Sequence, residues 1–160
     1  MGKASVTLTN NLPQLKGKVE KAAINWLEET TGELEAQVKR GSRSDGGGTA
    51  NSWSHEVDTV KKEGVVGSDQ MNAIWEEYGT GEFAVNGDGR GGAWYVPVES
   101  ATGSKKPSYN GKVIVVHGKN GKKYYKTNGK QPHPALEPAW SNVIPKAKKN
   151  LPAALKKIKP

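Results

Sequence analysis

The 160-residue sequence contains no cysteine. This absence excludes disulfides, thiolate metal sites and cysteine nucleophiles together. Apolar residues are also scarce, at 34% with a single phenylalanine, and the mean hydropathy is −0.74. A chain of this length fits one domain. Because its core must be small, we expect part of its stability to come from neighbouring subunits.

Long apolar runs are missing as well. Residues 1–11 lack the apolar stretch of a secretory signal, and nowhere do the roughly 18 apolar residues of a membrane span follow one another. We therefore expect a soluble protein that is made in a cytoplasm and has no membrane partner.

The charges are divided unevenly along the chain. Residues 1–99 carry 10 Lys/Arg and 15 Asp/Glu, a net charge of −5, whereas residues 100–160 carry 14 Lys and one Glu, a net charge of +13. The lysines either form a solvated face, contact nucleic acid, or dock against the acidic half of an identical neighbour in a ring. The charge distribution alone does not choose among these three interpretations. The lysines that it offers for DNA or inter-subunit contact are Lys119, Lys122, Lys123, Lys146, Lys148 and Lys149.

Hydrophobic periodicity predicts a long helix in the first quarter of the chain. Apolar residues recur at steps of three and four over residues 12–40, which is typical of an amphipathic helix. The Thr-Thr-Gly triplet at residues 30–32 weakens it, so one long helix or two short ones are both possible. Residues 41–49 contain glycine and serine without large apolar side chains, which predicts a loop.

The middle of the chain predicts a hairpin and a short helix. Residues 52–57 and 64–68 have the composition of strands around a charged turn. Asp69 then offers an N-cap for a helix over residues 70–78, which Gly79 ends. Residues 79–92 are rich in glycine and predict a surface loop.

The second half predicts further strands and a last helix. Residues 93–98 form a strand that Pro97 restricts to a sheet edge. Residues 112–117 and 122–127 flank an Asn-Gly pair and predict a hairpin. A helix follows from Pro134 to about Val143, where further prolines are expected to kink it.

These elements predict an α+β fold. We expect a mostly antiparallel sheet of four to five strands, packed against a long N-terminal helix and a C-terminal helix. Residues 1–145 would form the single domain, and residues 146–160 a basic, proline-containing tail.

The sequence offers no recognisable catalytic or metal-binding pattern. His55, His117 and His133 are isolated from one another, and no Gly-x-Ser-x-Gly elbow is present. Adjacent glutamates, Glu76 and Glu77, point about 100° apart on a helix and so do not converge on one substrate. They are expected on a solvated helix edge. The sequence therefore predicts no enzyme, cofactor or small-molecule substrate.

Three segments carry a recognisable order of residues. Residues 73–81 read AIWEEYGTG, residues 91–97 read GGAWYVP, and residues 125–139 read YKTNGKQPHPALEPA. Their order and spacing resemble the tail-component family of tailed bacteriophages, the head-tail joining or tail-completion proteins of the neck. The residues that carry the resemblance are Tyr78, Gly79, Thr80, Gly81, Thr127, Gly129, Pro132, Pro134, Leu136, Pro138 and Ala139.

The resemblance implies a structural virion protein of a long-tailed phage, assembled in the host bacterial cytoplasm. It implies a homo-oligomeric ring, a hexamer to match the tail, that adjoins neck and tail-tube proteins and touches packaged DNA non-specifically. Tail terminator, stopper and connector rings share small α+β folds, so the particular ring stays open. The alternative is a free-standing nucleic-acid-binding protein that uses the lysines together with Tyr109, Tyr124, Tyr125 and Trp140.

Overall fold

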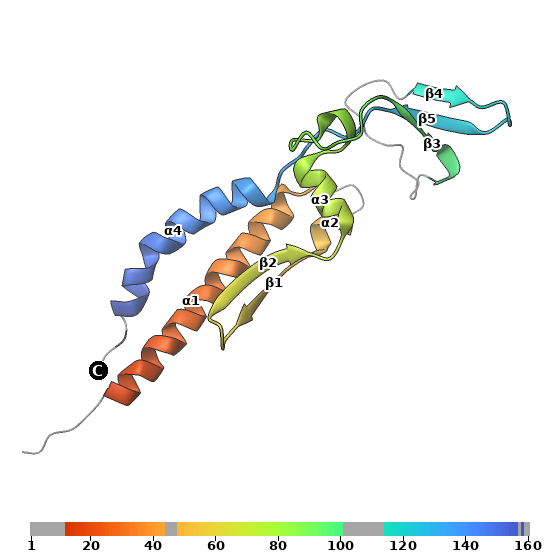
Figure 1. Ribbon diagram of the computed structural model, residues 1–160. Coiled ribbons are helices and arrows are strands. Elements are labelled where there is room, and N and C mark those ends of the chain that lie inside the picture. The colour runs from red at the N-terminus through yellow and green to blue at the C-terminus, as the bar shows by residue number, and fades with distance from the viewer. Residues whose placement is uncertain (1–11, 44–47, 101–113, 157, 159–160) are drawn as a thin grey trace, which may run out of the picture.

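Two long helices and two small antiparallel sheets make up the structure, a computed structural model that describes residues 12–43, 48–100, 114–156 and 158. Helices α1 (Leu12–Gly41) and α4 (Leu136–Lys156) lie side by side at one end of an elongated molecule (Figure 1). The other elements are α2 (Gly48–Asn51), β1 (Trp53–Asp58), β2 (Glu63–Ser68), α3 (Met71–Tyr78), η1 (Gly81–Phe83), β3 (Trp94–Pro97), η2 (Val98–Ser100), β4 (Ile114–His117) and β5 (Lys123–Thr127). The predicted α+β class, with long helices near both ends of the chain, is confirmed.

Helix α1 is continuous, so the first of the two alternatives holds. The Thr30 hydroxyl donates to Trp26 O at 2.7 Å, and the Thr31 hydroxyl donates to Leu27 O at 2.8 Å. These bonds inside the helix satisfy two buried hydroxyl groups. The threonines therefore face the protein interior without interrupting the helix.

The predicted first hairpin forms and packs on α1. Strands β1 and β2 pair antiparallel from Trp53↔Ser68 to Asp58↔Glu63. Trp53 is buried, and Val57 is half-buried on the same side of the strand. A loop was predicted over residues 41–49, but the chain directly before the hairpin forms a helical turn, α2. The side chain of Asn72 donates a hydrogen bond to Thr49 Oγ1 of this turn at 2.7 Å.

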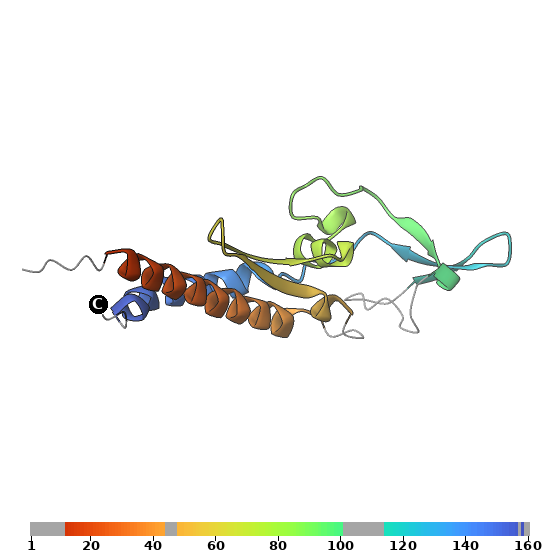
Figure 2. The same ribbon diagram turned by 90° about the horizontal axis from the view of Figure 1, so that it is seen from below.

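The strands form two separate sheets, although a single sheet was predicted. The second sheet has the order β3-β5-β4, with β3 at an edge as Pro97 requires. It extends beyond the helices, which Figure 2 shows from below. Tyr95, Ile114 and Val115 stay exposed on it, because neither long helix covers this sheet. The predicted strand residues 112–113, Tyr109 and residues 44–47 of the predicted loop lie outside the described residues.

Helix α4 continues beyond its predicted end at about Val143. Pro145 and Pro152 both lie inside the helix, and residues 146–156 are helical instead of a loose tail. The two prolines are seven residues apart and exposed, so both lie on the solvent side. A helix with prolines on its outer side bends toward the opposite side, and α4 curves over α1 in Figure 1. Trp26 Nε1 donates to Ala147 O, between the prolines, at 3.0 Å.

The hydrophobic core is small and lies where α1, β1, α3 and the beginning of α4 meet. Three of its seven residues are alanines, and Val38 is the one fully buried large side chain among the described residues. Eight hydrophobic residues are buried in the described part of the chain, whereas sixteen large hydrophobic residues are exposed. The described part of the chain therefore exposes twice as many large apolar side chains as it buries hydrophobic residues.

Candidate functional site

Two segments that are distant in sequence lie side by side at the junction between the helices and the three-stranded sheet. Residues 78–82 begin with the last residue of α3, and residues 127–132 begin with the last residue of β5. Thr80 N donates to Lys130 O at 2.9 Å, and Lys130 N donates back to Thr80 Oγ1 at 2.9 Å, across 50 residues of sequence. We call these two segments the motif junction, because both carry residues of the family resemblance.

Two glycines allow the segments of the motif junction to approach each other closely. Gly81 has a φ of 63°, and a Cβ atom there would lie 2.2 Å from Asn128 O. Gly129 has a φ of 127°, and a Cβ atom there would lie 2.0 Å from Thr80 O. No L side chain fits either position without moving the backbone. Gly81 of the first motif and Gly129 of the second are therefore explained by one contact.

Side chains complete the motif junction. Glu82 N donates to Asn128 O at 2.9 Å, and the Glu82 carboxylate accepts from Asn128 Nδ2 at 2.8 Å. The same carboxylate accepts from Gly92 N at 3.1 Å. The buried Thr127 hydroxyl accepts from Gly129 N at 3.1 Å. These polar groups bind the chain to itself, as in a scaffold.

Helix α3 presents its apolar side chains to solvent. Met71 is 63% exposed and Ile74 is 53% exposed, while Trp75 and Tyr78 are each 48% exposed. We call these four residues the α3 apolar face. The predicted cap by Asp69 is wrong, since Gln70 occupies the N-cap without a side-chain hydrogen bond. The contacts that attach α3 to the rest of the chain therefore come from the opposite side of the helix.

That opposite side carries Ala73 and two buried glutamates, so the predicted place of the glutamates on a solvated helix edge is wrong. Glu77 is 8% exposed, and its carboxylate accepts from the amides of Ala135, Leu136 and Glu137 at 2.7, 3.0 and 3.0 Å. The next residue, Pro138, has no amide hydrogen. Glu77 therefore satisfies the free donors at the beginning of α4 and places a negative charge at the positive end of the helix dipole.

Glu76 is the second buried carboxylate. Its Oε1 accepts from the Lys130 ammonium, and its Oε2 lies 3.3 Å from Arg43 Nε, an ion pair that lacks hydrogen-bond geometry. Its backbone oxygen accepts from His133 N at 2.6 Å. Glu76 and Glu77 thus attach α3 to the end of α1, to the motif junction and to α4.

The remaining motif residues prepare the beginning of α4. Pro132 is half-buried, and Pro134 is exposed and lies before the helix instead of in its first turn. Leu136 begins α4, and Ala139 is buried in the core.

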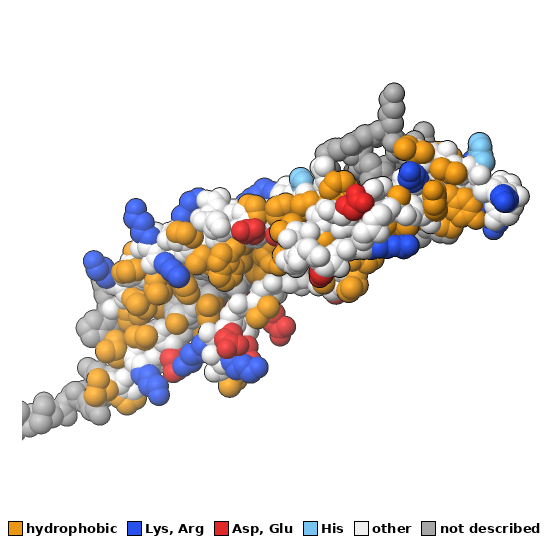
Figure 3. Space-filling model, turned by 45° about the horizontal axis from the view of Figure 1, so that its top comes forward, with side chains coloured by type: hydrophobic (Ala, Val, Ile, Leu, Met, Phe, Trp, Pro, Cys, Tyr) orange, Lys and Arg blue, Asp and Glu red, His pale blue; other side chains and the backbone are white. Residues whose placement is uncertain are grey.

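The exposed apolar surface continues beyond α3. Val85 N donates to Tyr78 O at 2.9 Å, which holds the following loop beside the helix. Val85 is 65% exposed and Phe83 is 41% exposed. Figure 3 shows hydrophobic side chains gathered on one face of the molecule, with Lys and Arg side chains around them.

The lysines offered for DNA or inter-subunit contact are not brought together. Lys119, Lys122 and Lys123 are exposed at the β4–β5 turn, which is the far end of the three-stranded sheet (Figure 1). The second group is exposed along α4, in the helical part of the molecule: Lys146, Lys148 and Lys149. They form two separate basic surfaces.

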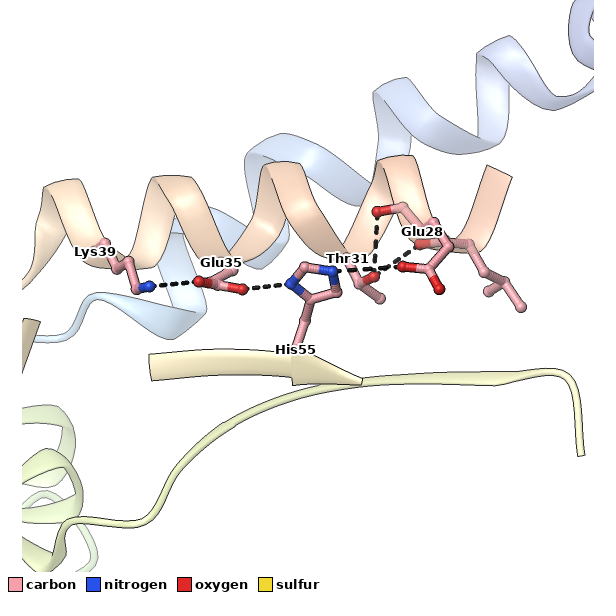
Figure 4. Close-up of polar contacts among 6 residues, drawn as sticks. Glu28, Thr31, Glu35, Lys39 and His55 are labelled. Atoms are coloured by element: carbon pink, nitrogen blue, oxygen red, sulfur yellow. Dashed lines mark hydrogen bonds and ion pairs between the residues drawn. The ribbon is translucent and has the colours of Figure 1, made fainter. Parts of the chain in front are cut away.

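A polar cluster fastens the β1–β2 hairpin to α1 (Figure 4). His55 Nδ1 donates to the Glu35 carboxylate, which also accepts from the Lys39 ammonium, and His55 Nε2 lies 3.5 Å from Glu28 Oε2. The hydrogen bond from Lys39, and then that from His55, lowers the pKa of Glu35 below its ordinary value of 4.5. Glu20 has its pKa lowered in the same way by Lys62.

Residues 12–43, 48–100, 114–156 and 158 contain no group of three His, Cys, Asp or Glu side chains that is placed to hold a metal ion. Among the same residues, no helix has the length and hydropathy that a membrane span requires.

Sequence reasoning missed the roles of Glu76 and Glu77, although a signal was present. Four large apolar residues on one side of an eight-residue helix leave the glutamates on the other side. The proline at position 138 also marks the first turn of a helix, whose free amides require an acceptor. Neither signal predicts which side of α3 contacts the rest of the chain.

Comparisons with family models, curated proteins and solved structures return no match.

Proposed function

We propose that the protein is a structural virion subunit of a long-tailed bacteriophage, a ring component that joins head to tail or completes the tail at the neck. The observation that carries this proposal is the outward α3 apolar face. Buried carboxylates hold α3 so that four large apolar side chains point away from the chain. Such a surface is typical of a contact with another protein.

The motif junction supports a scaffold role. The residues that resemble the phage tail-component family interlock through backbone hydrogen bonds and close glycine contacts. Their polar groups bind other parts of the same chain. These residues therefore fix α3 and the beginning of α4 relative to the three-stranded sheet, which is what a ring subunit of fixed geometry requires.

The size of the core supports self-assembly. In the described part of the chain, large apolar side chains are exposed more often than apolar side chains are buried. Contact with neighbours in a ring, proposed here to be hexameric, would remove part of this surface from water. Adjoining neck and tail-tube proteins would cover more, and packaged DNA would pass with non-specific contacts.

Immunogold electron microscopy tests this proposal. Antibodies against the protein are applied to phage particles from a bacterial strain that carries the gene, and to particles from a strain in which the gene is deleted. We expect label at the head-to-tail junction in the first case, and separate heads and tails in the second. Intact, infective particles without the gene would overturn the proposal.

The alternative of a free-standing nucleic-acid-binding protein has weaker support. Lys119, Lys122 and Lys123 lie far from Lys146, Lys148 and Lys149, so the two groups do not make one continuous binding surface. A phosphate backbone is bound best by lysines that share a surface.

A further inference from the structure

Helix α4 has an apolar flank of its own. Trp140 is 55% exposed and Leu155 is 37% exposed, while Ile144 and Leu151 are half-buried. Steps of four, seven and four residues place these side chains within roughly 60° of one another on a helix. We call these four residues the α4 flank.

Charge distinguishes the α4 flank from the α3 apolar face. Helix α4 contains four lysines and one glutamate, the exposed Glu137 in its first turn, which gives a net charge of +3, and Lys148 lies beside the flank. The chain around α3 carries exposed carboxylates at Asp69, Glu82 and Asp88. Of the nearby cations, Lys130 and Arg43 are paired with Glu76, and the exposed Arg90 lies over the Trp94 ring, so the three carboxylates still outnumber the one remaining cation. The two apolar surfaces therefore have edges of opposite charge.

We infer that the α3 apolar face of one subunit packs on the α4 flank of a second copy. Pairing α3 with α3 would bring together two acidic edges, each carrying Asp69, Glu82 and Asp88. Pairing α4 with α4 would place Lys148 against Lys148. The mixed pairing alone joins apolar surfaces and opposite charges, and complementary charges of this kind fix partner and register.

The consequence is a head-to-tail contact. One subunit uses two different surfaces, so each added copy leaves a free α3 apolar face and a free α4 flank, and the series ends when a ring closes. The inference rests on the proposed function as a ring subunit, and it names the interface that the ring would use.

The absence of cysteine makes a direct test available. Ile74→Cys and Trp140→Cys replace exposed side chains, and each variant then holds a single thiol. After mixing the two variants and mild oxidation, we expect disulfide-linked dimers at least tenfold more abundant than with either variant alone. Val60→Cys, which is 88% exposed at the hairpin turn, is the matched control and is expected to cross-link with neither.

Each other outcome overturns the inference. Efficient cross-linking of Ile74→Cys by itself would indicate an α3-to-α3 contact. Oligomers without an Ile74–Trp140 cross-link would place the interface elsewhere. A full-length chain that stays monomeric at every concentration would contradict any contact between copies.

A charge reversal gives a second measurement. Lys148→Glu is expected to weaken self-association about tenfold or more, because it places a carboxylate against the acidic edge of α3. Adding Asp69→Lys is expected to recover part of the loss. No weakening by Lys148→Glu would contradict the pairing. These tests use purified protein and examine only the contact between copies. The immunogold experiment uses phage particles and tests the place in the neck, so failure of one proposal can be distinguished from failure of the other.

Discussion

The Glu77 carboxylate and the Leu136 amide lie 3.0 Å apart, and this bond joins the side of α3 that faces the protein to the first residue of α4. Because Glu77 also binds the amides on either side of Leu136, α3 cannot rotate without exposing these amides. The orientation of the α3 apolar face therefore depends on this buried carboxylate, together with the contacts of Glu76.

Removing that carboxylate is expected to destabilise the protein. Glu77→Ala leaves three amide donors without acceptors, so we expect a loss of about 2–3 kcal/mol in the free energy of unfolding. Urea denaturation measures this quantity. Glu56→Ala, at an exposed position of β1, is the control and should change it by less than about 0.5 kcal/mol. Equal stability of the two variants would show that Glu77 does not hold α4.

Substituting a glycine of the motif junction is expected to separate its two segments. Gly129→Ala would place a Cβ atom against Thr80 O at a positive φ, at a cost of at least about 2 kcal/mol. Hydrogen exchange of the Lys130 amide, which bonds to Thr80 Oγ1, should accelerate. Gly91→Ala has open space and should leave this amide protected. Unchanged protection in Gly129→Ala would refute the close contact.

The Glu35 cluster is expected to make stability depend on pH. Since the folded-state pKa of Glu35 is lowered, the unfolded chain binds more protons near pH 4.5. The stabilisation is thus fully present above the unfolded pKa and is lost as pH falls through the folded pKa. Glu35→Gln should be about 1 kcal/mol less stable than the wild type at pH 7, with a smaller difference at pH 3.

Thermal unfolding across pH measures this difference. Glu33→Gln, on the same helix and 52% exposed, is the control and should lose less than about 0.5 kcal/mol at pH 7. A Glu35→Gln difference that grows on acidification would contradict the assigned sign.

DNA binding by the isolated subunit is expected to be weak. The lysines of the β4–β5 turn and of α4 form separate surfaces, so we expect a non-specific Kd of about 10⁻⁴–10⁻⁶ M that rises steeply with salt. Mobility shift with duplex and single-stranded DNA at several salt concentrations measures it. Nanomolar binding by a monomer would favour the nucleic-acid-binding alternative instead.

Local sequence signals predicted the elements well, because their causes are local. The amphipathic spacing of residues 12–40 predicted α1, and the Asn120-Gly121 pair predicted the β4–β5 hairpin. Pro97 at an edge strand follows from its missing donor. Each of these depends on a few neighbouring residues.

The orientation of elements was not predictable, because it depends on distant contacts. The spacing of the apolar residues in α3 gives the helix an apolar side, but the contacts of Glu77 some 60 residues away decide that this side faces outward. Likewise, Pro145 and Pro152 were expected to kink the last helix at about Val143 and leave a basic tail, whereas α4 continues as a bent helix packed on α1. The motif residues were found from their order, but their meeting at one junction required the fold.

Sedimentation velocity of the full-length wild type and of Trp75→Ser tests the central claim, that the outward α3 apolar face exists for assembly. Trp75 is 48% exposed, so the substitution leaves the core in place. We predict that the wild type at micromolar concentration sediments as a closed oligomer, near six copies of a 17.2 kDa chain, and that Trp75→Ser shifts toward single subunits. A wild type that remains monomeric, or a Trp75→Ser variant that assembles equally well, would contradict the account.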